Sequence, residues 1–375
     1  MIMTAVMLSC TTSLQALTPQ QSVDNLKARI APDKRTAIFN VTADKKGVIG
    51  RVGTQEQLDA LREALRADGL ASLPVNVTVL EKQVPAGKRW ALVTNAVATL
   101  RAEAKHSAEI ETQVVMGMPL KILEIDDDWC HVVCPDGYIS WVPASSISFR
   151  TDEQLAAWKH APRYVVTEYS SRLTTEPGGD VTVTDLVLSN ILELKGSADG
   201  DFLLLALPDG RQGYISRDEV QEISVWASQE FDADLLERTA RRMMGSTYLW
   251  GGTSTKMTDC SGLMKVCYLA NGIILQRDAS QQALTGKKIK FEDWPTAERG
   301  DLVFFGNTKT GRVTHVGMYL YDGKVIHCSG RVKVNSLNPE HADYLKGYGF
   351  LSLSRIKGMI GTTGIVQAIN HPWFF

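Results

Sequence analysis

Cys260 is the residue of this chain best suited to nucleophilic chemistry. It lies in the segment 247–262, which reads TYLWGG, a polar loop and then DCSG, and the apolar run 263–270 that follows predicts a helix. Free backbone N–H groups at the start of a helix carry partial positive charge and favour a sulfur anion. We therefore predict that Cys260 is a nucleophile whose thiolate forms readily.

Two histidines downstream could supply the base that a thiol nucleophile needs and the group that orients this base. His315 lies in THVGMYL and His327 in VIHCSG, both apolar runs of strand type, and the Asp-Gly of YDGK between them is typical of a hairpin turn. A histidine alone is more often a core residue. The combination with Cys260 favours a catalytic site.

A metal site is the alternative use of the same residues, with Cys328 as a further ligand. Alternation along a strand turns Cys328 away from His327, and no cysteines have zinc-finger spacing. Cys130 and Cys134 lie four residues apart on one predicted strand, so their Cα atoms would be about 13 Å apart, too far for a disulfide. We predict neither a metal nor a cofactor.

The composition is that of an ordinary globular protein. The chain has 375 residues, enough for two to four domains, with 44% hydrophobic and 22% charged residues and a net charge of −2. No basic stripe is present to neutralise phosphates, which argues against a nucleic-acid partner.

The N-terminal residues 1–21 resemble an incomplete export signal. A short apolar run ends in Ser9 and Cys10, as in a bacterial lipoprotein, but no Lys or Arg precedes it. We expect a lipid anchor at Cys10, with an ordinary disordered terminus as the alternative.

Residues 22–90 predict a small α/β module, in which Thr54 begins a capped helix between strands. Nothing in this module is typical of catalysis.

Two later stretches, 92–149 and 165–223, repeat one design. Each has a hydrophobic strand that ends in Pro-Asp-Gly and is followed by Tyr-Ile-Ser, at Tyr138 and at Tyr214. Short strands with tight turns predict two small barrels, and 151–162 between them predicts a helical linker.

Together, the motifs TYLWGG, DCSG, RDASQQ, GDLVFF, THVGMYL and VIHCSG resemble the NlpC/P60 cysteine peptidases, papain-like hydrolases of bacterial cell-wall peptides, over about 231–360. The two repeats resemble bacterial SH3 (SH3b) domains. The resemblance implies an α+β multidomain chain: a papain-like catalytic domain preceded by two SH3b barrels and the α/β module. The expected boundaries are 1–21 for the terminus, 22–90 for the module, 91–150 and 163–225 for the barrels, 151–162 for the linker and 226–375 for the catalytic domain.

The family resemblance implies a role for each catalytic residue. Cys260 is the nucleophile, His315 the general base, and His327 the polar residue that orients this base. Tyr248 corresponds to the family tyrosine whose hydroxyl helps to stabilise the oxyanion.

Two SH3b domains before an NlpC/P60 domain resemble the γ-D-glutamyl-L-diamino acid endopeptidases of the dipeptidyl-peptidase VI type. In that group the first SH3b domain blocks one end of the cleft, which implies substrates with a free N-terminal L-alanine. The resemblance implies that Tyr138, Glu103 and Asp259 bind the ammonium group. Glu109 and Glu111 in the same loop compete with Glu103, and a core role is the alternative for Tyr138.

The RDASQQ motif implies further substrate contacts. Arg277 could pair with a substrate carboxylate in bidentate fashion, and Asp278 and Ser280 could hydrogen-bond peptide groups. Asp278 could also cap a helix, with Gln281 at its third position. Ser261, beside the nucleophile, could hydrogen-bond the ligand or simply begin a helix.

The sequence thus predicts a cysteine endopeptidase that cleaves the γ-D-glutamyl–diamino acid bond of L-Ala-γ-D-Glu-diamino acid peptides through a thiolate and a thioester. The alternative is an inert protein that binds the cell wall through its SH3b domains. We expect a monomer in the cell envelope or periplasm of a bacterium, with the cytoplasm as the other possible location.

Overall fold

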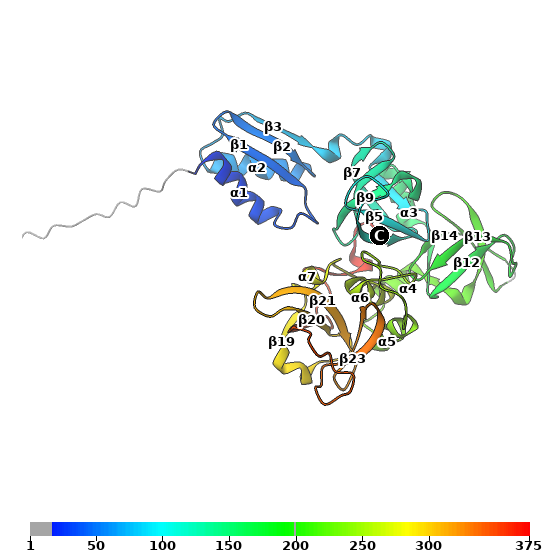
Figure 1. Ribbon diagram of the computed structural model, residues 1–375. Coiled ribbons are helices and arrows are strands. Elements are labelled where there is room, and N and C mark those ends of the chain that lie inside the picture. The colour runs from blue at the N-terminus through cyan, green and yellow to red at the C-terminus, as the bar shows by residue number, and fades with distance from the viewer. Residues whose placement is uncertain (1–16, 199) are drawn as a thin grey trace, which may run out of the picture. The chain divides into compact units, whose positions relative to one another are not determined.

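The computed structural model describes residues 17–198 and 200–375 and divides the chain into two compact units, one ending at Gln83 and the other beginning at Val84 (Figure 1). The two units are described separately. The expected lipid anchor at Cys10 lies outside the described residues.

The N-terminal unit is a three-stranded sheet with two helices. Its elements are α1 Pro19–Ile30, β1 Phe39–Asp44, β2 Gly47–Val52, α2 Gln55–Ala67, β3 Val75–Val79 and a 3₁₀ turn, Leu80–Lys82. The strand order is β1-β2-β3, and α2 joins β2 to β3, which are parallel. Thr54 and Gln57 form a capping box at the start of α2, as predicted.

Helix α1 lies partly in a stretch for which no structure was predicted. Thr18 and Gln21 form a capping box around Pro19 at the first helical position, and Val23 and Leu26 are buried in the core of this unit. The prediction that the terminus extends to residue 21 is therefore wrong for its last residues.

Two seven-stranded sheets follow, which we call the first barrel (β4–β10) and the second barrel (β11–β17). The strands of the first are β4 Trp90–Val93, β5 Val97–Arg101, β6 Ile110–Val115, β7 Pro119–Asp126, β8 Trp129–Val133, β9 Ile139–Pro143 and β10 Ile147–Arg150. Those of the second are β11 Arg163–Val166, β12 Ser170–Thr174, β13 Thr182–Val187, β14 Ile191–Ala198, β15 Phe202–Ala206, β16 Gln212–Ser216 and β17 Val220–Glu222.

The two barrels have the same strand order. The first runs β10-β4-β7-β8-β9-β5-β6, and the second, taken in the same sense, runs β17-β11-β14-β15-β16-β12-β13. The repeat seen in the sequence is therefore a repeat of topology. Between the barrels, helix α3 Asp152–His160 begins at the capping box of Thr151, in the stretch predicted to be a helical linker.

The C-terminal domain consists of short helices and a six-stranded antiparallel sheet. Its helices are α4 Ile223–Ser228, α5 Ala233–Arg242, α6 Cys260–Ala270 and α7 Ala279–Gln282. The sheet contains β19 Lys287–Lys290, β20 Leu302–Asn307, β21 Arg312–Tyr319, β22 Lys324–Ser329, β23 Arg331–Ser336 and β24 Phe350–Arg355, in the order β19-β24-β20-β21-β22-β23. A separate pair joins β18 Ile273–Leu275 to β25 Ile365–Gln367.

Helix α6 packs on one face of this sheet, where its Leu263 and Met264 share a core with Phe304 and Met318. A continuous apolar core also joins the first barrel to the C-terminal domain. Trp226 and Phe374 from the C-terminal domain are buried in it. In Figure 1 the first barrel lies next to the part of the C-terminal domain that contains α6. The shared core therefore holds this barrel beside helix α6.

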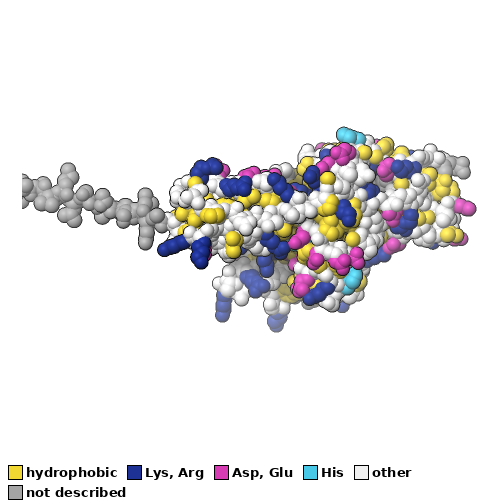
Figure 2. Space-filling model, turned by 90° about the horizontal axis from the view of Figure 1, so that it is seen from above, with side chains coloured by type: hydrophobic (Ala, Val, Ile, Leu, Met, Phe, Trp, Pro, Cys, Tyr) yellow, Lys and Arg dark blue, Asp and Glu magenta, His cyan; other side chains and the backbone are white. Residues whose placement is uncertain are grey.

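The surface carries both signs of charge. On the face shown in Figure 2, acidic and basic side chains alternate with apolar and uncharged ones, and neither sign covers the face alone. Over the described residues, no helix is both long enough and apolar enough to span a bilayer.

Candidate active site

Cys260 is the first residue of helix α6, and Asp259 before it is the N-cap. The Asp259 Oδ1 atom accepts the backbone N–H of Gly262 at 2.7 Å, which fixes the start of the helix. A side chain at Gly262 would overlap the carbonyl oxygen of Gly252, so the glycines of WGG and DCSG allow the loop to pass close to the helix.

The sulfur of Cys260 lies against strand β21. The backbone N–H groups of Val316 and Ser261 both donate hydrogen bonds to it, which brings the sulfur to the strand position next to His315. Burial is the largest influence on the thiol, followed by the charge of Asp259, and together they raise its pKa to about 11. The prediction that the thiolate forms readily is therefore wrong for the free enzyme, because burial and Asp259 raise the pKa by more than the N–H groups of Val316 and Ser261 lower it.

His315 and His327 form a hydrogen-bonded pair on adjacent antiparallel strands, as predicted. His315 Nε2 lies 2.8 Å from His327 Nδ1, and His327 Nε2 lies 2.9 Å from Asn335 Oδ1. An amide oxygen only accepts, so His327 donates from Nε2 and accepts from His315 at Nδ1. The remaining nitrogen of His315, Nδ1, is then free to accept a proton.

Both imidazoles are neutral at neutral pH. Burial, the neighbouring His327 and then Lys333 lower the pKa of His315 to about 3. Burial likewise lowers the pKa of His327, although its hydrogen bond to Asn335 acts in the opposite direction. The resting site therefore contains a neutral thiol and two neutral imidazoles.

Asn335 was not among the predicted site residues. It lies on β23, and its Nδ2 atom donates to the carbonyl oxygen of Asp343 at 3.0 Å, which turns Oδ1 towards His327. The sequence signal for Asn335 is its position on the strand. It is a polar residue two positions after Lys333, the cross-strand partner of His327, so the two side chains lie on the same face of the sheet.

Tyr248 lies near Cys260, so a negative charge on the sulfur acts on the phenol. The tyrosine packs against the core that contains Cys260, and its backbone N–H donates to the carbonyl oxygen of Gly330 at 3.0 Å. Burial first, and then Cys260, raise the pKa of this phenol. Tyr248 is therefore a neutral hydroxyl that can donate a hydrogen bond.

Asp259, Ser261 and Arg277 form a buried network of their own. Arg277 Nη2 pairs with Asp259 Oδ2 at 2.5 Å, and Arg277 Nη1 donates to Ser261 Oγ at 2.9 Å. The Arg277 side chain is 1% exposed and that of Asp259 is 7% exposed. Arg277, Asp259 and Ser261, which were predicted to bind the substrate, are thus partners of one another in this structure, and their binding of a ligand stays a prediction.

Tyr138 reaches from the first barrel to the start of α7. Its hydroxyl donates to Asp278 Oδ2 at 3.4 Å, and Asp278 forms the capping box of α7 with Gln281, as predicted. Ser280 follows on the same short helix and is half-buried. Tyr138 and Asp278 thus mark the point where the first barrel meets the catalytic domain.

The acidic loop of the first barrel contacts the C-terminal domain through Glu109. Glu109 Oε1 accepts the indole N–H of Trp250 at 2.6 Å, whereas Glu103 pairs with Lys105 at 2.7 Å and its side chain is 65% exposed. Glu111 accepts a hydrogen bond from Ser140 inside the barrel. The choice of Glu103 over its neighbours is therefore not supported by its contacts.

His327 and Cys328 have different partners, as strand alternation predicted. Cys328 Sγ donates to the carbonyl oxygen of Thr258, on the side of α6, whereas His327 faces His315. Over the described residues, no group of three His, Cys, Asp or Glu side chains is arranged to bind a metal ion.

Two protein families match this chain. Residues 245–347 match the NlpC/P60 family, and residues 100–147 match the bacterial dipeptidyl-peptidase SH3 domain. The chain contains an NlpC/P60 cysteine peptidase domain and a bacterial SH3 domain. The first barrel is this SH3b domain, and the second barrel shares its topology.

Several relatives of this chain are named dipeptidyl-peptidases. It is 27% identical to the gamma-D-glutamyl-L-lysine dipeptidyl-peptidase of Bacillus cereus, over 58% of this chain and 67% of that protein. It is 29% identical to dipeptidyl-peptidase 6 of Lysinibacillus sphaericus, over 68% of this chain and 94% of that protein. Among solved structures, an NlpC/P60 family protein from Bacillus cereus shares the fold, with a TM-score of 0.62 and 23% identity over 72% of this chain and 99% of that one.

Proposed function

We propose that this enzyme hydrolyses the amide bond between the γ-carboxyl group of D-glutamate and a diamino acid, in cell-wall peptides that begin with a free L-alanine. The names of the Bacillus cereus and Lysinibacillus sphaericus relatives support this substrate class. The observation that carries the proposal is the buried hydrogen-bond chain from Asn335 through His327 to His315. His315 lies on β21, next to Val316, whose backbone N–H donates to the Cys260 sulfur.

The neutral resting site implies that the thiol loses its proton during attack. As the Cys260 sulfur bonds to the γ-carbonyl carbon, its proton passes to Nδ1 of His315, and the carbonyl oxygen becomes an oxyanion. The Cys260 backbone N–H and the Tyr248 hydroxyl would donate to this oxygen, and each donor contributes on the order of 3 kcal/mol to the transition state.

The second half of the reaction returns the enzyme to its starting state. The C–N bond breaks as His315 gives its proton to the leaving amine, and a thioester remains on Cys260. Water then attacks the thioester and transfers a proton to His315, which returns it to the departing sulfur. His327 and Asn335 hold His315 in one tautomer throughout these steps.

Selection of a free N-terminus would take place where the first barrel meets the catalytic domain. Tyr138 and Asp278 bring a hydroxyl and a carboxylate together there, a pair suited to bind an ammonium group. An acylated N-terminus carries no charge and needs more room, so the same pair would disfavour it.

The test uses L-Ala-γ-D-Glu-L-Lys and the corresponding diaminopimelate peptide, each with a free and an acetylated N-terminus. Mass spectrometry should detect the dipeptide L-Ala-γ-D-Glu and the free diamino acid from the unblocked peptides. Cys260→Ala should form neither product while its circular dichroism spectrum stays unchanged. Absence of the dipeptide with the parent enzyme, or persistent hydrolysis by Cys260→Ala, would overturn the proposal.

A further inference from the structure

A buried ion pair connects the first barrel to the helix that begins with Cys260. Asp136, in the turn between β8 and β9, pairs with Lys265 on α6. We propose that Asp136 and Lys265 are positioning residues, which hold Tyr138 beside Asp278 and so set the preference for a free N-terminus. This inference rests on the proposed function.

The same carboxylate also fixes the turn that carries Tyr138. Asp136 Oδ1 accepts the backbone N–H of Tyr138 at 3.0 Å, while Oδ2 pairs with Lys265. The turn closes with hydrogen bonds from Gly137 to Cys134 and from Cys134 to Tyr138, both 2.8 Å. A shift of Asp136 relative to α6 therefore moves the backbone of Tyr138 with it.

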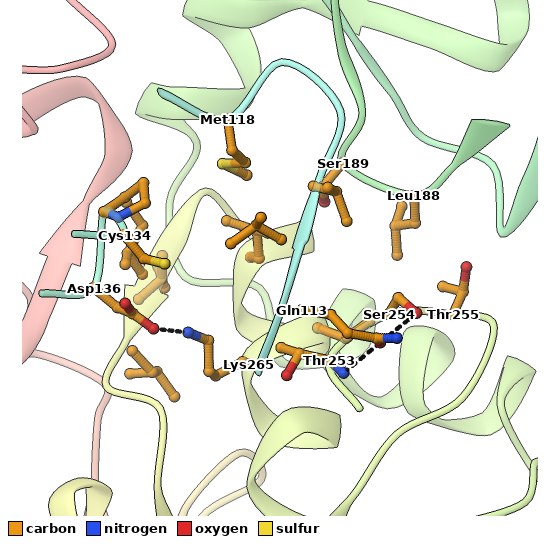
Figure 3. A pocket seen from close by; sticks show the side chains of 18 residues that line it. Gln113, Met118, Cys134, Asp136, Leu188, Ser189, Thr253, Ser254, Thr255 and Lys265 are labelled. Atoms are coloured by element: carbon orange, nitrogen blue, oxygen red, sulfur yellow. Dashed lines mark hydrogen bonds and ion pairs between the residues drawn. The ribbon is translucent and has the colours of Figure 1, made fainter. Parts of the chain in front are cut away.

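A second polar contact lies across a small cavity from this ion pair. Gln113 Oε1, on β6, accepts the backbone N–H of Thr253 at 2.9 Å and the hydroxyl of Ser254 at 3.0 Å. Figure 3 shows the two contacts on opposite sides of the cavity, which has a volume of about 60 Å³. The barrel is thus attached both before and after Cys260 in the sequence.

The turn is also held from the C-terminal segment. His371 Nε2 lies 2.9 Å from the carbonyl oxygen of Pro135 and donates to it, while Nδ1 accepts the backbone N–H of Trp373 at 3.2 Å. His371 thus holds the turn at Pro135, and Lys265 holds it at Asp136.

The burial of the ion pair indicates a role in geometry more than in stability. The side chains of Lys265 and Asp136 are only 15% and 4% exposed. A buried ion pair adds little net stability, because the loss of hydration offsets the attraction between the two charges. The pair nevertheless favours one relative position of the groups that carry the charges. The apolar core joins the barrel to the C-terminal domain over a wide area, and the ion pair adds a directional contact at the turn that precedes Tyr138.

The second barrel contains the same Pro-Asp-Gly turn, but there the aspartate pairs with a residue of its own turn. Asp209 of its Pro-Asp-Gly turn pairs with Arg211 of the same turn at 2.7 Å and accepts the Arg211 backbone N–H at 3.1 Å. Gly210 has a positive φ of 91°, close to the 83° of Gly137. Asp209 is therefore a matched control: the motif and the local hydrogen bond are the same, but its ion pair stays within the turn.

The test compares Asp136→Asn and Asp209→Asn on the free and the N-acetylated tripeptide. Asparagine can still accept the Tyr138 N–H through Oδ1, but its Nδ2 cannot accept from Lys265, so D136N removes the ion pair and keeps the hydrogen bond within the turn. We expect D136N to raise KM for the free peptide about tenfold, with kcat within about twofold of the parent, and to lower the preference for the free over the acetylated peptide by a similar factor. D209N should leave that preference unchanged.

Two substitutions of Lys265 serve as a second arm should D136N fail to fold. Lys265→Met should lose the preference as D136N does, and Lys265→Arg, which keeps the charge, should retain it within about threefold. Equal preferences in Met and Arg variants, or a D136N enzyme that slows on both peptides equally, would overturn the inference and indicate a purely structural pair. A parent enzyme that cleaves neither peptide would reject the proposed function itself, and the inference with it.

Discussion

At the scale of single residues, the site keeps the Cys260 thiol and the His315 imidazole uncharged in the resting enzyme. Burial raises the pKa of Cys260 and lowers that of His315, so the thiol keeps its proton and the imidazole stays a base. The hydrogen-bond chain through His327 to Asn335 leaves one nitrogen of His315 available for the thiol proton. In the proposed reaction, the proton therefore moves from Cys260 to His315 during the attack on the carbonyl carbon and not before it.

The pKa of His315 predicts how activity responds to acid. In the proposed reaction the neutral imidazole of His315 is the base, and it persists above its pKa of about 3 and is lost only as pH falls through that value. We expect kcat/KM at pH 5 to stay within about twofold of its value at pH 7, whereas a pKa of 6.5 would cost about 25-fold. A pH–rate profile on the tripeptide distinguishes the two cases, with circular dichroism at each pH to verify folding. A half-loss of activity near pH 6.5 would contradict the neutral-base arrangement.

Asp259 predicts a second effect, on thiol reactivity. Its charge raises the pKa of Cys260, so Asp259→Asn should lower that pKa, while asparagine still caps helix α6. The measurement is the alkylation rate of Cys260 with iodoacetamide against pH, followed by mass spectrometry of its peptide.

Asp232→Asn provides the control for this measurement. Asp232 caps the neighbouring helix α5, so its replacement tests the loss of a cap charge elsewhere. We expect D232N to leave the alkylation profile unchanged. An alkylation profile of D259N that coincides with the parent would show that Asp259 does not act on the sulfur.

At the scale of elements, the loop before Cys260 is shaped by the barrel next to it. Gly251 has a φ of 82°, and a Cβ atom there would lie 2.5 Å from the carbonyl oxygen of Ile110. The indole N–H of Trp250 and the backbone N–H of Thr253 donate to barrel residues on either side of this glycine. The first glycine of the WGG motif is therefore needed for close approach of the barrel as well as for its backbone conformation.

A pair of glycine substitutions separates these two requirements. Gly245 has nearly the same φ of 83° but no atom within 4 Å of a Cβ atom placed there. We expect Gly245→Ala to cost only the strain of a positive φ, about 1 kcal/mol, and Gly251→Ala to cost at least about 2 kcal/mol more because it also clashes with Ile110. Urea unfolding measures both. Equal losses would mean that the barrel yields easily at this contact.

The helix start at Cys260 and the pairing of the two histidines could be predicted from sequence because both are local features. Cys260 begins a helix, and His315 and His327 lie on two strands of one hairpin, so residue type and spacing suffice to pair the two imidazoles. The roles of Arg277 and Glu103 could not be found in this way. Arg277 is 18 positions from Asp259, the carboxylate with which it pairs. The loop that contains Glu103 is oriented by tertiary contacts, in which Glu109 bonds Trp250 while Glu103 pairs with Lys105.

The ionisation of Cys260 also depends on tertiary structure. Its position at a helix start is visible in the sequence and favours the thiolate, but the desolvation that outweighs this effect arises only when α6 packs on the sheet. Helix α1 is a different case. Its capping signal, Thr18 with Gln21, is local and is visible in the sequence.

At the scale of the whole molecule, buried histidines make stability depend on pH. Burial lowers the pKa values of His315, His327 and His371 below 6.5, so the unfolded chain takes up protons first as pH falls. Stability from these groups is complete above about pH 6.5 and declines below it, by about 2 kcal/mol at pH 5 for His315 alone.

Urea unfolding at pH 7.5 and pH 5 measures this decline. We expect a lower midpoint at pH 5 in the parent, and a smaller change in His371→Gln, which removes one of the three groups from outside the catalytic pair. A midpoint that does not move between the two pH values would show that the buried histidines do not control acid stability.

The contact between His371 and Pro135 also has a consequence for the order of folding. These residues are 236 positions apart in the sequence, and closing a loop of that length costs entropy before any contact repays it. Each barrel and the sheet of the peptidase domain are built from neighbouring segments and can form earlier. Refolding enzyme should therefore regain its strand structure first and its peptidase activity later, when the chain end closes over the turn.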